Sequence, residues 1–205
     1  FDPEFEGDAG PIQRSIGPGP VDTIQWMIAL QRLILGGEAA EISCRSSSLD
    51  EPLTPTNFNP KNASTQGSAN VQAVKVDDSG IYVQRGGTRV YELAFGNETL
   101  DYASTNLSAL VPEIGQPQIV AMAVQRQPDT RIHVVRSDGT SALLTYDKVE
   151  QVLCWSEVET DGDIEDVCVR GADAGDEEDA VYYSVARTIN AATVRYLEKW
   201  ALESQ

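Results

Sequence analysis

Histidine is almost absent from this sequence, since His133 is the only imidazole in 205 residues. Ser-His-Asp or Cys-His catalysis would need that one residue, which lies in the strand-like stretch RIHVVR, to be correctly placed. Phosphate-binding loops are missing too, because no GxGxxG opens a helix and no GxxxxGK[ST] occurs. We predict that His133 is a strand residue, and that the chain has no catalytic residue, no cofactor site and no enzymatic activity.

Cysteine is scarce and scattered. Cys44, Cys154 and Cys168 lie far apart without a CxxC pair, so neither a zinc site nor a disulfide framework is indicated. This spacing favours a reducing compartment.

Long apolar runs are also lacking. The longest, around residues 28–35, is interrupted by Gln31 and Arg32, and no secretory signal is recognisable. We therefore expect a soluble chain that contacts no membrane.

Basic residues are few: 15 Lys and Arg stand against 32 Asp and Glu, for a formal net charge of -17. Such a charge repels the phosphate backbone, so direct nucleic-acid binding is disfavoured. Part of the excess is clustered in 161–166 (DGDIED) and 173–179 (DAGDEED), which we interpret mainly as solvated loops.

The first of these clusters has some features of a calcium-binding loop. Asp161, Asp163 and Glu165 alternate as oxygen ligands do, but the ordered twelve-residue loop with its terminal Glu is missing. We predict an acidic turn and no metal site, and leave open whether 161–166 or 173–179 binds a cation.

Alternating apolar residues are what the sequence has in abundance, punctuated by Gly, Pro, Asn and Asp, which is typical of many short strands. One apolar template recurs four times at intervals of about 45 residues. Its copies are Ile24-x-x-Met27-x-Ala29, Val71-x-x-Val74-x-Val76, Ile119-x-x-Met122-x-Val124 and Ile164-x-x-Val167-x-Val169.

Each copy is followed by two further strand-like segments. A fourth is predicted at 151–159 and a weaker one at 101–110. Four antiparallel strands in about 45 residues is the size of one β-propeller blade. The sequence thus predicts an all-β, propeller-like fold over 24–202, with about four blades starting near 24, 71, 119 and 164; a β-sandwich is the alternative.

Glycine-rich corners separate the second and third segments of the first three units, as GGEA, RGGT and SDGT; the last unit has RTINA. Glycine takes the positive φ that a tight hairpin turn requires. We interpret Arg85-Gly86-Gly87-Thr88 as such a turn, because RNA-binding Arg-Gly-Gly tracts usually occur as repeats. Packing between blades or across the hairpin is predicted for Tyr82, Val90, Tyr91 and Leu93.

Two segments do not follow the pattern. For residues 1–23 we predict an irregular arm or the end of an upstream module. For 47–69 we predict a long loop, which is either a loose edge strand with its loop or a contact loop. The sequence holds at most about four and a half units, whereas a closed ring has typically about four to eight blades and must join the last blade to the first. We expect an incomplete or open propeller and a piece of a longer protein.

Carbohydrate chemistry gives two alternative functions. Trp26, Trp155 and Trp200 could stack on sugars in an adhesin, although tryptophan in a strand is more often core. A propeller-type glycan hydrolase would need two converging carboxylates, and the sequence indicates no candidate pair.

Several ordered segments carry a family resemblance. They are IQWMIALQRLILGGEAAEISC, LTPTN, QGSANVQAVKVDDSGIYVQRGGTRVYELAF, MAVQRQPDTRIHVVRSDGTSALLTYDKVEQVLCWSEVETDG and ARTINAATVRYLEKW, spanning Ile24 to Trp200. Together they resemble the tail protein of short-tailed bacteriophages known as tail tubular protein B, the nozzle or the packaged-DNA stabilisation protein.

The resemblance implies a structural virion protein, made in the host bacterial cytoplasm. It implies a sixfold homo-oligomer below the portal and its adaptor, in contact with tail fibres or spikes, forming a channel for genome retention and ejection. DNA would pass without specific binding, because an acidic wall offers phosphates no attachment points. The family has no catalytic residues to transfer.

Overall fold

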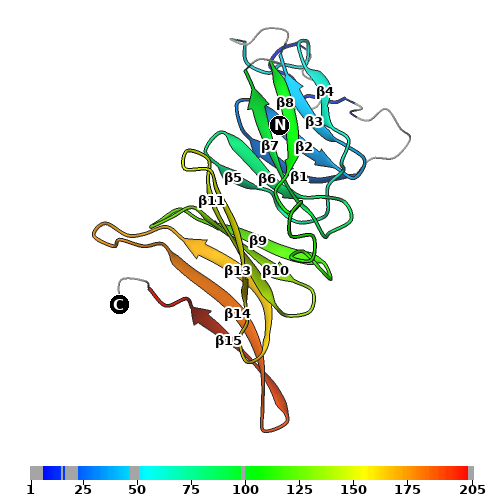
Figure 1. Ribbon diagram of the computed structural model, residues 1–205. Coiled ribbons are helices and arrows are strands. Elements are labelled where there is room, and N and C mark those ends of the chain that lie inside the picture. The colour runs from blue at the N-terminus through cyan, green and yellow to red at the C-terminus, as the bar shows by residue number, and fades with distance from the viewer. Residues whose placement is uncertain (1–6, 15, 17–22, 47–50, 98–99, 203–205) are drawn as a thin grey trace.

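The computed structural model describes residues 7–14, 16, 23–46, 51–97 and 100–202. All regular structure in this part of the chain is β: fifteen strands form four separate antiparallel sheets (Figure 1). Each sheet is built from antiparallel strands that are consecutive in the chain, so no connection within a sheet crosses over another strand. The predicted all-β class, with four successive sheet units, is confirmed.

Three sheets have four strands and the last has three, ordered as in the sequence. The first sheet holds β1 (Ile24–Ala29), β2 (Leu33–Gly37), β3 (Glu41–Arg45) and β4 (Asn59–Ser64); the second holds β5 (Val74–Val76), β6 (Ser79–Val83), β7 (Val90–Gly96) and β8 (Asp101–Asn106). The third holds β9 (Ile119–Gln125), β10 (Arg131–Arg136), β11 (Ser141–Asp147) and β12 (Val152–Val158); the fourth holds β13 (Asp163–Arg170), β14 (Ala180–Ile189) and β15 (Ala192–Lys199).

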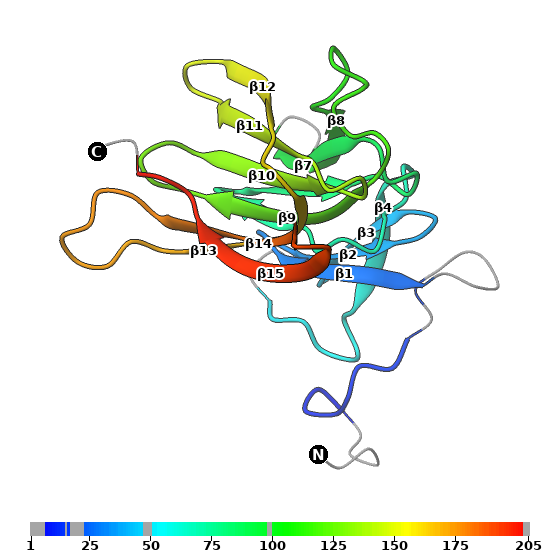
Figure 2. The ribbon, with the colours of Figure 1, turned by 90° about the horizontal axis from the view of Figure 1, so that it is seen from below.

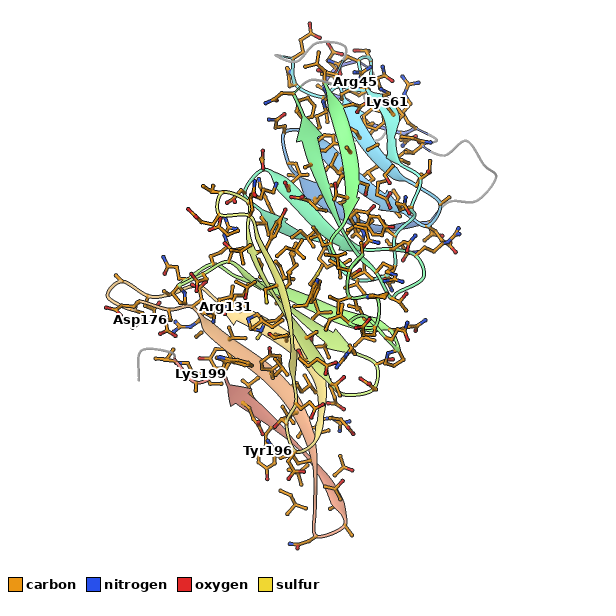
Figure 3. All side chains as sticks on the ribbon, viewed as in Figure 1. Arg45, Lys61, Arg131, Asp176, Tyr196 and Lys199 are labelled. Carbon is orange, nitrogen blue, oxygen red and sulfur yellow. The ribbon has the colours of Figure 1, made fainter. Side chains whose placement is uncertain are left out.

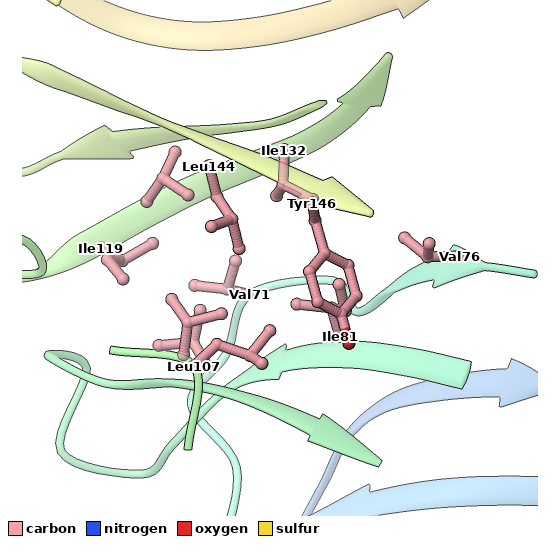
Figure 4. Close-up of a cluster of buried hydrophobic side chains, with 11 residues drawn as sticks. Val71, Val76, Ile81, Leu107, Ile119, Ile132, Leu144 and Tyr146 are labelled. Atoms are coloured by element: carbon pink, nitrogen blue, oxygen red, sulfur yellow. The ribbon is translucent and has the colours of Figure 1, made fainter. Parts of the chain in front are cut away.

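The four sheets stack face to face in chain order, and a separate hydrophobic cluster fills each interface. Strand alternation explains how the middle sheets serve two neighbours. In β6, Tyr82 belongs to the cluster shared with the first sheet, whereas Ile81 and Val83 belong to the cluster shared with the third sheet (Figure 4). In β10, Ile132 and Val134 face the second sheet, and Val135 joins the cluster shared with the fourth.

Neighbouring sheets do not pack alike across their width. The first two touch through their outer strands β4 and β8, as the layers of a sandwich do, whereas the last two touch through β9, β10 and β13. The third and fourth sheets therefore diverge away from these strands, as propeller blades do. The first and fourth sheets lie at opposite ends of the stack, which is an open arc (Figures 1 and 2).

A buried polar contact accompanies each interface. The Ser68 hydroxyl donates to Glu41 Oε1 at 2.7 Å between the first two sheets. The Tyr146 hydroxyl donates to Glu92 Oε2 at 2.9 Å between the second and third. The third and fourth sheets are joined by Tyr183 and His133, whose hydroxyl oxygen and Nδ1 lie 2.5 Å apart.

Hairpin corners follow the prediction in two units and depart from it in the first. Gly87 has a φ of +76° and donates its amide to the Gln84 carbonyl, so Arg85–Thr88 is a turn between β6 and β7. Gly139 has a φ of +82° in the turn between β10 and β11. Gly36, predicted at a tip, lies inside β2. A Cβ there would be 2.1 Å from Trp26 Cε2, so this glycine makes room for the indole ring.

The segment 47–69, predicted as a long loop, contains the edge strand β4. Its sequence NPKNAS conceals a strand because polar residues and Pro60 are tolerated at a sheet edge. Leu53 and Phe58, just before it, pack on Leu35, Ile42 and Cys44 and cover the outer face of the first sheet. Of residues 1–23, 1–6, 15 and 17–22 lie outside the described residues, and the others carry no strand.

Candidate interaction surface

The fourth sheet differs from the others in lacking a fourth strand within the described residues. Its third strand, β15, pairs with β14 from Ala192 opposite Ile189 to Lys199 opposite Tyr182. Two ion pairs hold it in place: Arg187 with Glu198, and Arg195 with Glu165, each with an N–O distance of 2.7 Å. The outward edge of β15 is paired with no strand of the described chain.

Apolar side chains are exposed around this edge. Val194 and Tyr196 lie on the face of β15 that carries buried Val185 on the adjoining strand, and Tyr196 is 42% exposed. Leu197 lies on the opposite face and is 71% exposed. Figure 3 shows Tyr196 and Lys199 at this outer side of the molecule.

His133 is a buried strand residue, as predicted. Gln125 Nε2 donates to the Gln127 carbonyl, which leaves Gln125 Oε1 to accept from His133 Nε2 at 3.1 Å. His133 Nδ1 is then the acceptor for the Tyr183 hydroxyl. Burial, and secondarily the charge of Arg131, lower the pKa of His133 to about 4. A neutral, fully bonded imidazole sealed between two sheets stabilises the interface and cannot reach a substrate.

All three tryptophans pack against the core. Trp26 is buried against Tyr82, and Trp200 packs on His133 and Tyr183. Trp155 is half-buried, and its Nε1 donates to the Leu107 carbonyl at 2.9 Å. The predicted core role is confirmed, and no indole ring is presented as a flat exposed platform for a sugar.

Two of the acidic residues of 161–166 lie in one surface cleft. Asp163 and Glu165 line a cleft of about 430 Å³ with Asp138 and Arg136. Glu165 is held by Arg195, which lowers its pKa. Burial alone would raise the pKa of Asp138, but the hydrogen bonds that its carboxylate accepts from Thr140 lower this pKa overall. Neither is suited to donate a proton at neutral pH. In the described residues, no group of three or more His, Cys, Asp or Glu side chains is arranged to hold a metal ion.

Asp179 is a structural residue that sequence reasoning missed. The interpretation of 173–179 as solvated loop is right for Asp176 and Glu177 but wrong for Asp179, which is buried. Its carboxylate accepts from the amides of Arg126 at 2.6 Å, Gln127 at 3.0 Å and Ala172 at 2.9 Å. It thereby ties the β13–β14 connection to the end of β9. Position at the end of the acidic run, directly before β14, was the only available signal.

A second cleft of about 430 Å³ lies at the opposite end of the stack, lined by Arg32, Arg45, Leu53 and Phe95. Arg32 lies over the Phe95 ring, 5.0 Å from its centroid, and 4.0 Å from Asp101. These contacts join the β1–β2 turn to the second sheet, so Arg32 serves the interface between sheets.

The cysteines form no bridge. Cys44, Cys154 and Cys168 are all free thiols, and burial raises the pKa of Cys44 to about 11.

The described residues include no helix of the length and apolarity needed to cross a bilayer. Comparison with protein-family models and with curated proteins returned no match to this chain.

Proposed function

We propose that this chain is a structural component of a bacteriophage tail, part of the nozzle or tail tube that retains and releases the genome. Two lines of reasoning support the proposal. The ordered motifs between Ile24 and Trp200 resemble that family, and the sheets form a stack of rigid units suited to repeated subunit contacts.

The observation that carries the proposal is the asymmetry of the stack. Its first sheet is covered by Leu53 and Phe58, whereas its fourth presents an unpaired strand edge flanked by exposed apolar residues. A covered end and an uncovered end give the arc a direction, as a subunit of a closed ring requires. The sixfold ring, the portal and adaptor neighbours and the tail fibres follow from the resemblance alone.

Charge fits the same role. The net charge of -17 makes the chain a poor ligand for DNA, which suits a wall along which a genome slides. The packing of the tryptophans on the core and the structural roles of His133 and Asp179 favour an architectural protein over an adhesin or a glycan hydrolase.

The test is made on particles of the phage that encodes the chain. Quantitative mass spectrometry should find it in purified virions at about six copies per portal ring, the number that the family resemblance implies for a closed ring. A nonsense mutation early in the gene should yield capsids that package DNA and then lose it, and complementation should restore retention. Virions that lack the chain, or mutant particles that keep their genome and infect normally, would overturn the proposal.

A further inference from the structure

The third and fourth sheets are joined covalently by residues 159–162, the short connection between β12 and β13. This connection contains Asp161 followed by Gly162, one of only two Asp-Gly pairs in the sequence. The other is Asp138–Gly139, in the turn between β10 and β11. An aspartate that precedes glycine can react with the next backbone amide, because glycine has no Cβ to hinder the approach and takes many backbone conformations. The two pairs can therefore be compared as candidate sites of one reaction.

At Asp138 both reacting groups are engaged, although the side chain is exposed. Its carboxylate accepts from the amide of Thr140 at 3.1 Å and from the hydroxyl of the same residue at 2.6 Å. The Gly139 amide donates to the Arg136 carbonyl at 3.1 Å within the hairpin turn. These hydrogen bonds must break before the two groups can meet, so the native turn protects this pair.

At Asp161 neither group is engaged in this way. The side chain is fully exposed, and its ion pair with Arg187 has an Nη1–Oδ2 distance of 3.9 Å, which is too long for a hydrogen bond. Arg187 donates to the backbone carbonyl of Asp161 and to the Thr160 hydroxyl, and so leaves the carboxyl group free. Among the described residues, no group accepts a hydrogen bond from the Gly162 amide. Gly162 has a φ of +132° in a bend outside the strands.

We propose that Asp161–Gly162 is a modification site at which the chain converts spontaneously to isoaspartate. The Gly162 nitrogen attacks Asp161 Cγ, a C–N bond forms, and the N–H proton leaves with the hydroxyl of the carboxyl group as water. Water then opens the cyclic imide. Cleavage of the new bond restores aspartate. Cleavage of the original peptide bond leaves the backbone running through Cβ and Cγ of Asp161, with its α-carboxyl group free. No net atoms are gained and no electrons are transferred.

The product would alter the covalent link between the third and fourth sheets. Isoaspartate adds one methylene group to the backbone of a short connection. The carbonyl that accepts from Arg187 becomes part of a free carboxylate outside the backbone, so the connection loses this backbone hydrogen bond to the fourth sheet. Arg187 is also bound to Glu198 of β15, which makes it the residue that relays the change to the fourth sheet. The inference goes beyond the proposed function and holds wherever the protein acts.

The two Asp-Gly pairs can be followed in one sample of the intact chain. Trypsin cuts after lysine and arginine, which places Asp138 in peptide 137–148 and Asp161 in peptide 149–170. After weeks at neutral pH, a protein isoaspartyl methyltransferase with a labelled methyl donor should label peptide 149–170 about tenfold more than peptide 137–148, because the hydrogen bonds at Asp138 must first break. A digest of fresh protein gives the background. The imide should appear in peptide 149–170 as a mass deficit of one water.

Two controls separate the effect of the fold from that of the sequence. In urea, the two peptides should be labelled within about twofold of each other, since a hydroxyl residue precedes each Asp-Gly pair and the native hydrogen bonds are gone. Asp161→Glu moves the carboxyl group one methylene further from the amide at an exposed position. This variant should lose the label in peptide 149–170 and keep that in peptide 137–148 unchanged.

Several results would overturn the proposal. These are equal labelling of the two peptides in the folded chain, stronger labelling of peptide 137–148, and no labelling of peptide 149–170 above the fresh digest. Label that persists in peptide 149–170 of Asp161→Glu would also overturn it, because another aspartate would then be the site. None of these outcomes affects the presence of the protein in virions, so the two proposals fail separately.

Discussion

His133 links two sheets through a neutral ring, and this makes its protonation a test of the interface. The folded pKa of about 4 lies below the ordinary 6.5, so the unfolded chain takes up a proton first as pH falls. The stabilisation is fully present above about pH 6.5 and is lost toward about pH 4, amounting to at most about 3 kcal/mol.

We expect His133→Gln to reduce this pH dependence. Glutamine can donate to Gln125 but does not ionise, so stability at neutral pH should fall modestly while the slope between about pH 6.5 and pH 4 becomes shallower. Urea unfolding across this range measures both. Parallel profiles for the two proteins would show that carboxylates alone cause the acid sensitivity.

The tight packing of Gly36 against Trp26 predicts that a larger residue at this position lowers the stability of the fold. Gly36→Ala brings a Cβ against the indole of Trp26, and overpacking of this kind costs about 1–3 kcal/mol. Gly86→Ala is the matched control, because no atom lies within 4 Å of its Cβ position. Its effect should stay within about 0.5 kcal/mol. Chemical denaturation measures both; equal stability of the two variants would contradict the packing account.

At the scale of elements, the β13–β14 connection depends on Asp179. Asp179→Asn exchanges one carboxylate oxygen for an amide donor facing backbone N–H groups, and we expect a loss of about 2 kcal/mol. Exchange of the Arg126 and Gln127 amides should accelerate. Asp176→Asn, exposed in the same loop, is the control and should change neither. Unchanged exchange in Asp179→Asn would show that the carboxylate does not hold the connection.

The strands that sequence reasoning found are those with a regular apolar signal. The template located the first strand of each sheet, and 101–110 and 151–159 contain β8 and β12. β4 was hidden because an edge strand does not need apolar alternation. Gly36 looked like a turn residue because the sequence does not distinguish a glycine that makes room for a neighbouring ring from one that adopts a positive φ. Asp179 looked solvated because its acceptors are backbone amides, which no side-chain pattern reveals.

At the scale of the whole molecule, the sequence predicted four sheet units but not how they contact each other. The sandwich-like first pair and the divergent last pair arise from long-range packing of β4 on β8 and of β13 on β9 and β10. The uncovered third strand of the last sheet likewise became visible only by comparison with the three complete sheets.

The charge of the whole molecule predicts weak affinity for duplex DNA. With a net charge of -17, the purified chain should not retard linear DNA in gel shift at about 150 mM salt, and lowering the salt should strengthen repulsion. A basic DNA-binding domain of similar size serves as the positive control. Salt-sensitive retardation would contradict the account of a passive channel wall.

The buried polar contacts between the sheets have a consequence for assembly. Glu41 is hydrogen-bonded to a serine, Glu92 to a tyrosine and His133 to another tyrosine, so each interface has a different pair of polar partners. A sheet that packed against the wrong neighbour would bury a carboxylate or an imidazole without its hydrogen-bond partner, at a cost in free energy. The three junctions are therefore not interchangeable, and a misordered or intermolecularly swapped arrangement is penalised before any outside partner is involved.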